Sequence, residues 1–155
     1  MKDARLASLT FTLQVANPST DPASGVLITG AEEFGLVGAR VYAGLQDSLA
    51  EVQVVNLDTI DQEGTLYVVT HDRRGASAAT RVTAQLAAAG LAARSRRLPV
   101  GILVDSLPLA RAGASAVTIG RLNWRTLRII HTPADGPEGL SLEMAERVGR
   151  AIAAS

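Results

Sequence analysis

Two short apolar runs in this chain lead directly to carboxylates. The run 26–28 is followed by Glu32 and Glu33, and the valine-rich run 52–55 is followed by Asp58. Short apolar runs of this kind are typical of strands that are buried on both faces of a sheet. Segments with helical spacing separate the apolar runs, and this alternation predicts a mainly parallel sheet with helices on both faces. Functional groups of such sheets gather at the carboxyl ends of the strands, where these carboxylates are expected.

Periodicity predicts the other elements. Apolar and polar residues alternate over residues 9–15, which predicts a half-buried strand at a sheet edge. The basic stretch 94–97 contains no aromatic residue, so we interpret it as a solvated linker rather than a nucleic-acid site. We predict strands over 26–29, 52–55, 66–69 and 116–119, and helices over about 36–49, 77–89, 108–112 and from 141 to the C-terminus.

The composition excludes several kinds of site and partner. The chain has no cysteine, which excludes disulfides, thiolate nucleophiles and cysteine-ligated zinc. Its formal net charge is zero, so there is no electrostatic reason to expect nucleic acid or a membrane as a partner. We expect one domain over residues 1–155, and no run approaches the ~20 apolar residues of a membrane span. The N-terminus lacks a signal-peptide pattern, so a soluble, cytoplasmic protein is expected.

Four side chains are the main candidates for a hydrolytic metal site: Glu32, Glu33, Asp58 and His131. A carboxylate-rich set with one imidazole suits zinc or a similar divalent ion. One of two adjacent glutamates can bind the metal while the other accepts a proton from the attacking water. Each residue also has a structural interpretation, since Asp58 could cap the turn after its strand and His131 could form a hydrogen bond in the core.

Four motifs follow one another along the chain, namely Gly30–Tyr42, Val54–Asp58, Asp105–Ala116 and Ile130–Asp135. They resemble motifs of the co-catalytic di-zinc aminopeptidases. This family also includes glutamate carboxypeptidase-like enzymes and glutaminyl cyclases. The Glu-Glu motif of the family reads approximately Gly-x-Glu-Glu-x-Gly-Leu-x-Gly-Ser, and Ala39 stands here in place of its serine. The motif Ser-Asp-His of the family is matched at Asp105, without the histidine.

The resemblance implies a three-layer α/β/α zinc-exopeptidase sandwich whose first strands are missing or replaced by residues 1–25. It implies that Glu32 is the general base of peptide-bond hydrolysis. Glu33 and His131 would bind one zinc ion and Asp58 a second, so one or two ions are expected. The substrate would be a peptide or an amino-acid-like small molecule.

The family also uses ligands that this chain does not clearly supply. There is no histidine before His71, so an upstream His-x-Asp motif is absent. Asp21-Pro22 resembles the bridging Asp-Asn motif, but a loop aspartate before a proline is the alternative interpretation. A second function therefore remains open, namely a catalytically inactive domain of this fold that binds a ligand or a partner. An open sheet edge where strands are missing also favours a homo-oligomer.

Three further residues have both a functional and a structural interpretation. His71, next to Asp72, is interpreted as part of a polar turn at a strand end. Asp105 is interpreted as the N-cap of the short helix that follows it. Trp124 could line a substrate pocket or pack in the core.

Overall fold

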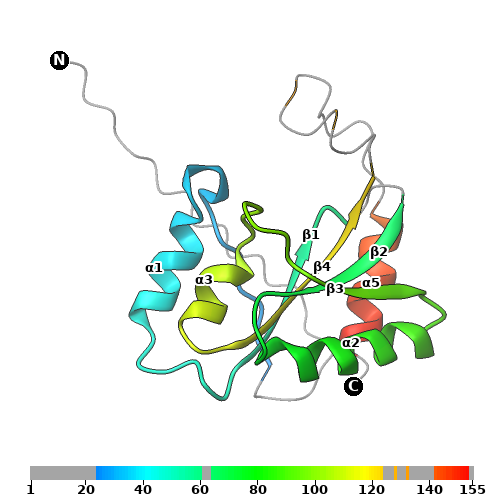
Figure 1. The fold of residues 1–155 in the computed structure, drawn as a ribbon, viewed down its shortest axis with the longest axis horizontal. Helices are drawn as coiled ribbons and strands as arrows, with labels where there is room; N and C mark the ends of the chain where they lie inside the picture. Colours follow the sequence, from blue (N-terminus) through cyan, green and yellow to red (C-terminus); the bar gives the residue numbers. More distant parts are fainter. Residues whose placement is uncertain (1–23, 61–63, 124–127, 129–131, 133–141, 154–155) are drawn as a thin grey trace.

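Four strands form one sheet in the spatial order β1-β4-β2-β3 (Figure 1). The computed structural model describes residues 24–60, 64–123, 128, 132 and 142–153. β1 pairs with β4 and β2 with β3 in parallel, while β2 and β4 are antiparallel. The predicted, mostly parallel α/β sheet is therefore confirmed, with one antiparallel pair at its centre. The strands are β1 (Gln53–Asp58), β2 (Thr65–Thr70), β3 (Ala93–Arg97) and β4 (Ser115–Leu122).

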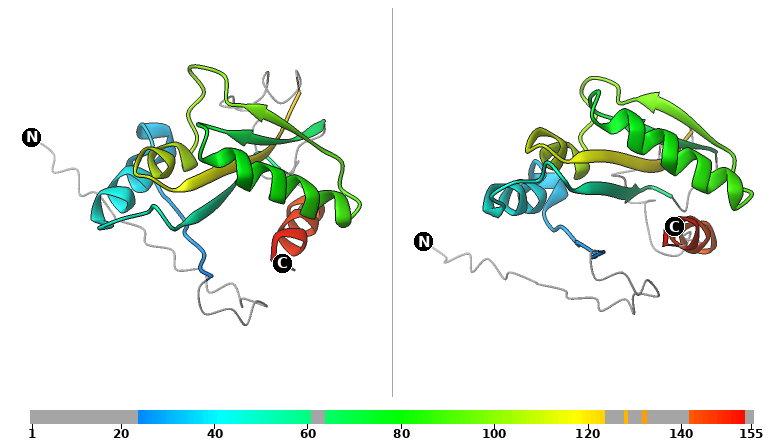
Figure 2. Two further views of the ribbon diagram at one scale, coloured as in Figure 1. Left: turned by 60° about the horizontal axis from the view of Figure 1, so that its bottom comes forward. Right: turned by 90° about the horizontal axis from the view of Figure 1, so that it is seen from below.

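Helices cover both faces of this sheet. They are α1 (Val37–Leu45), α2 (Gly75–Ala88), α3 (Ser106–Arg111) and α5 (Glu143–Ala153), and a short 3₁₀ turn η1 (Glu32–Phe34) precedes α1. α1 and α3 lie together, away from α2 and α5 (Figures 1 and 2). None of the helices in the described ranges is long and apolar enough to cross a membrane.

The alternation of side chains along β4 separates two apolar clusters. Val117 and Ile119 are fully buried in the larger cluster, with residues of α2 and α5. Ala116 points to the opposite face and packs in the smaller cluster, with Leu109 of α3. Successive residues of a strand face opposite sides of its sheet, so β4 is the central layer between the two helical layers. This is the predicted three-layer arrangement.

Several predicted elements form close to their expected positions. The strands predicted at 52–55, 66–69 and 116–119 lie within β1, β2 and β4, and the helix predicted over 77–89 is α2. The buried stripe expected on the last helix is also confirmed, because Val148 is fully buried and Ala145 and Ile152 pack against the same cluster.

Three predictions about secondary structure are wrong. Residues 26–29 form no strand, and Val26 is 66 % exposed, because none of the described strands pairs with this segment. The helix that follows ends at Leu45 rather than near Leu49, and Leu45 is 75 % exposed. The basic stretch 94–97 is solvated as predicted, but it belongs to β3 and is not a linker. Charged side chains are common on an edge strand, where they discourage pairing with another chain.

β1 lies at the other end of the described sheet. Its outer edge pairs with no strand among the described residues, and Leu57 is 48 % exposed. The strand predicted over 9–15 lies outside the described residues. The homo-oligomer expected from an open edge therefore stays a prediction.

Candidate metal and catalytic site

The predicted glutamate pair lies on a tight turn between two residues with left-handed backbone conformations. Ala31, with φ 57°, precedes Glu32, and Leu36, with φ 60°, precedes α1. Such conformations are uncommon for residues other than glycine, and they concentrate at functional sites. Leu36 N–H donates to the Glu32 carbonyl at 2.8 Å, which closes the turn. Glu32 is half-buried and Glu33 is exposed, so both carboxylates are at the surface.

A close backbone contact fixes this turn to the first residues of α1. Gly38 N–H donates to the Gly30 carbonyl at 3.0 Å. A Cβ atom added at Gly38 would lie 2.5 Å from that carbonyl oxygen and 2.7 Å from the Gly30 nitrogen. The last glycine of the Glu-Glu motif therefore has a local structural role, since only glycine allows the two backbones to approach this closely.

Asp58 ends β1 at a second unusual point of the backbone. Thr59, directly after it, has φ 50°, which is an outlier for a β-branched residue. Asp58 pairs with Gly120 of β4, and a Cβ atom at Gly120 would lie 2.7 Å from the Asp58 carbonyl oxygen. The end of β1 is thus closely packed against β4, and this packing fixes the position from which the Asp58 side chain extends.

Two other carboxylates act electrostatically on Asp58 at this strand end. Burial raises the pKa of Asp58 above its ordinary value, and the negative charges of Asp105 and then Glu33 raise it further. Glu33 is thus within electrostatic range of Asp58, and the assignment of these two residues to a metal site stays a prediction. Asp105 is also within electrostatic range of Asp58, and the sequence favoured a structural role for it over that of a ligand.

We predict that Asp58→Asn stabilises the metal-free chain. A raised pKa means that the ionised carboxylate is less favourable in the folded chain than in the unfolded chain, so this cost is present at neutral pH and disappears as the pH falls. Removal of the charge should raise the free energy of unfolding by on the order of 1 kcal/mol, the usual size of a stabilising substitution. Urea unfolding in the presence of a chelator measures this change. An equal or lower stability of Asp58→Asn would contradict the cost of the ionised Asp58 carboxylate in the folded chain.

Asp105 precedes α3, as an N-cap does, but its side chain makes no capping hydrogen bond. Thr29 Oγ1 instead donates to Asp105 Oδ2, which ties the segment before the glutamate turn to the start of α3. The other carboxylate oxygen, Oδ1, is buried and has no hydrogen-bond partner among the described residues. Asp105 thus occupies the predicted N-cap position, but its side chain does not cap the helix. Its place in a motif of the di-zinc family was the signal that could have pointed to the site.

A series of hydrogen bonds, buried at its centre, reaches the strand that carries Asp58. His71 Nε2 lies 2.7 Å from Ser106 Oγ, and Ser106 Oγ lies 2.5 Å from Thr118 Oγ1. Asn56 Nδ2 donates to Thr118 Oγ1 at 3.4 Å. Ser106 and Thr118 are 1 % and 4 % exposed. These hydrogen bonds connect the turn after β2 with α3, β4 and β1, and they reach β1 two residues before Asp58.

His71 has a structural role in this network. Asp72 forms the polar turn that was predicted, because its Oδ1 accepts hydrogen bonds from the backbone N–H groups of Arg74 and Gly75, where α2 begins. Burial lowers the pKa of His71 below its ordinary value; Asp72 opposes this shift and Arg111 adds to it. A neutral His71 is thus favoured in the folded chain.

We predict that His71 makes stability fall in mild acid. A lowered pKa gives a stabilising contribution that is present above the ordinary value of 6.5 and is lost as the pH falls from there toward the folded value. Between about pH 7.5 and about pH 5.5, the wild type should lose more stability than His71→Gln, which cannot titrate but can still donate to Ser106. Urea unfolding of both proteins measures the difference, and identical pH slopes would contradict it. His131 is present in both proteins, so any contribution that it makes to the pH dependence of stability cancels in the comparison.

Three predicted candidates lie outside the described residues, namely Asp21, Trp124 and His131. Within the described ranges, no three or more histidine, aspartate or glutamate side chains are grouped so that they could hold a metal ion. The described carboxylates therefore form part of a metal site at most.

Comparisons with known proteins agree with this arrangement of motifs. The sequence profile of peptidase family M28 matches residues 6–155. The chain belongs to peptidase family M28. No curated protein sequence matches the chain.

Solved structures of aminopeptidases share the fold of this M28 chain. The zinc aminopeptidase BSAP from Bacillus subtilis matches with a TM-score of 0.63 and 25% identity, over 81% of this chain and 33% of that chain. An aminopeptidase from Aneurinibacillus sp. strain AM-1 matches with a TM-score of 0.61 and 23% identity, over 80% of this chain and 31% of that one. The Legionella pneumophila LapA aminopeptidase matches with a TM-score of 0.60 and 22% identity, over 79% of this chain and 36% of that chain. The chain thus spans about a third of the length of these relatives.

Proposed function

We propose that this chain takes part in peptide hydrolysis as a metal-dependent, aminopeptidase-like hydrolase. The observation that carries the proposal is the glutamate turn, which holds Glu32 and Glu33 between two left-handed residues and is fixed to α1 by the contact of Gly38 with Gly30. The negative charge of Glu33 also raises the pKa of Asp58. These residues come from two separate motifs of a chain that belongs to family M28. A cation would relieve the repulsion between these carboxylates.

The residues present fit a zinc site in part. The described carboxylates supply oxygen ligands, and a zinc site usually needs three or four protein ligands. Glu33 and His131 would hold one ion and Asp58 a second. When bound, zinc lowers the pKa of a coordinated water to about 7 and polarises the scissile carbonyl. Further ligands would come from a second subunit or from an upstream segment.

Glu32 is the proposed general base. It precedes Glu33 in the same short turn, so a proton acceptor and a metal ligand lie side by side. The left-handed Ala31 and the Gly38–Gly30 contact hold the turn in place, which keeps the base in a fixed position. The bond from Asn56 to Thr118 fixes the strand that bears Asp58. A positioned carboxylate base contributes roughly 10²–10⁴ in rate.

Zinc content and turnover of the full chain test this proposal together. Zinc per chain is measured by mass spectrometry after dialysis, and hydrolysis of leucyl p-nitroanilide is followed with and without added zinc. Bound zinc and turnover that depends on zinc would support the hydrolase. A chain with no tightly bound metal and no turnover would contradict it.

A catalytically inactive domain is the second candidate, and Ser106 favours it. Ser106 follows Asp105 where the resembling motif has histidine, and its hydroxyl is buried between His71 and Thr118. This position therefore offers no imidazole to the site. A chain that binds one zinc ion weakly, without turnover, would support this candidate.

A further inference from the structure

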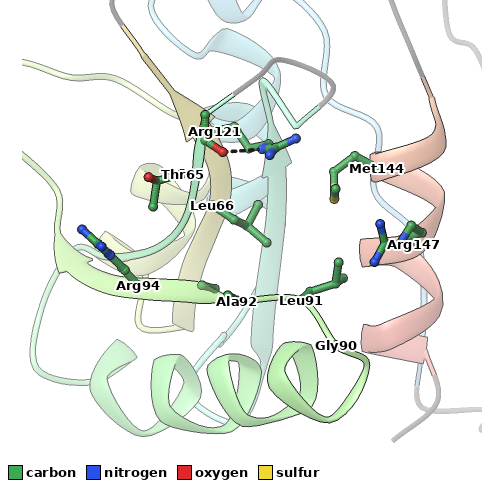
Figure 3. Close-up of a pocket in the computed structure, with 11 residues that line it drawn as sticks. Thr65, Leu66, Gly90, Leu91, Ala92, Arg94, Arg121, Met144 and Arg147 are labelled. Atoms are coloured by element: carbon green, nitrogen blue, oxygen red, sulfur yellow. Dashed lines mark hydrogen bonds between the residues drawn. The ribbon is translucent and has the colours of Figure 1, made fainter.

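A cavity lies on the face of the sheet opposite Ala116 and α3. It occupies about 570 Å³ between the beginnings of β2 and β3, the end of β4 and helix α5 (Figure 3). Leu66 and Leu91, which line it, belong to the cluster that packs against α2 and α5. The cavity is therefore separate from the glutamate turn and from the residues proposed for hydrolysis.

Positive charge and apolar surface meet in this cavity. Its lining includes Arg94, Arg121 and Arg147, and none of the 11 described lining residues is acidic. In Figure 3, Arg121 and Arg147 extend toward one another beside Met144, while Arg94 extends away from them. Two guanidinium groups that face one space repel each other, and an anion between them offsets this repulsion because it attracts both.

A hydrogen bond holds one of the two facing arginines. Arg121 Nε donates to the Gly64 carbonyl at 2.9 Å, which positions its guanidinium group at the rim of the cavity. On α5, Glu146 forms an ion pair at 2.6 Å with Arg150. The acidic residue beside Arg147 in the sequence is thus engaged with a different arginine, one turn further along the helix.

We propose that this cavity binds an aliphatic carboxylate. The carboxylate would accept hydrogen bonds from Arg121 and Arg147, because the planar guanidinium group matches carboxylate geometry. The hydrocarbon body would cover Leu66, Leu91 and Met144, which adds the gain from apolar burial. A fully hydrated anion such as inorganic phosphate would leave this apolar wall uncovered and would bind more weakly.

Octanoate is the probe, and calorimetric titration of the full chain is the measurement. We expect octanoate to bind with a Kd of about 1 mM or tighter, and neutral octanamide and inorganic phosphate to bind at least about tenfold more weakly. Arg147→Gln should weaken octanoate binding by about tenfold or more, the effect of losing one charge-assisted hydrogen bond. Arg150→Gln is the matched control on the same helix, outside the cavity lining, and should leave binding unchanged.

Three results would overturn the proposal. The first is that octanoate does not bind to the wild type. The second is that Arg147→Gln and Arg150→Gln bind octanoate equally well, with thermal unfolding showing that both are folded. The third is that octanoate binds only to the double variant Asp61→Asn/Glu63→Gln. These two carboxylates precede Gly64 and lie outside the described residues, and this result would mean that they serve as the counter-ions of the arginines.

Discussion

Gly38→Ala should lower the free energy of unfolding by about 1–3 kcal/mol, the usual cost of forcing extra atoms into a close-packed place. The added methyl carbon would lie 2.5 Å from the Gly30 carbonyl oxygen and 2.7 Å from the Gly30 nitrogen. Both neighbours are backbone atoms, so no side chain can rotate to relieve the contact. The backbone before Glu32 must move instead, and any hydrolytic activity should fall with it. Urea unfolding and leucyl p-nitroanilide hydrolysis measure the two effects.

Gly44→Ala is the matched control on the same helix. A Cβ atom at Gly44 would meet no heavy atom within 4 Å. Alanine in place of glycine within a helix is expected to be neutral or to stabilise by up to about 1 kcal/mol. Equal losses of stability in the two variants would contradict the specific role of the contact between Gly38 and Gly30.

Glu32→Gln should reduce kcat for leucyl p-nitroanilide by roughly 10²–10⁴, the usual contribution of a positioned general base. Glutamine has nearly the same shape but cannot accept the proton. Zinc content and stability should remain close to those of the wild type, because the assigned metal ligands are Glu33, Asp58 and His131. Unchanged zinc content with a lost rate separates the role of a base from that of a ligand.

Glu51→Gln controls for the loss of one negative charge. Glu51 is exposed in the loop before β1, so its replacement should leave kcat unchanged. A Glu32→Gln variant as active as Glu51→Gln would contradict the assignment of Glu32 as the base.

Elements with a local signal could be predicted from the sequence. The helical spacing of Val82 and Leu86 is strong, and both residues are fully buried in α2. Residues 26–29 have the apolar composition of a strand, but pairing depends on distant residues, and no described strand lies beside this segment. The arginines of 94–97 suggested a linker, because an edge strand can carry charges that resemble those of a loop.

At the candidate site too, features with a local pattern could be predicted from the sequence, and contacts between distant segments could not. Glu33 and Asp58 were predicted from motifs that follow apolar runs, and in the structure the charge of Glu33 acts on Asp58. Their role as metal ligands stays a prediction. The contribution of Asp105 was missed, because the sequence position before a helix suggests a cap whatever the side chain contacts. Its bond from Thr29 joins segments that are far apart in the sequence, and no local pattern indicates such a contact.

The location of bound zinc tests the central claim most directly. A crystal structure of the full chain grown with zinc, with data collected at the zinc absorption edge, would locate each ion by its anomalous signal. We predict an ion bound by Glu33 and His131 at about 2.0–2.2 Å, with Asp58 beside it or on a second ion. A zinc ion bound elsewhere, or a His131 side chain directed away from Glu33, would contradict the proposed site.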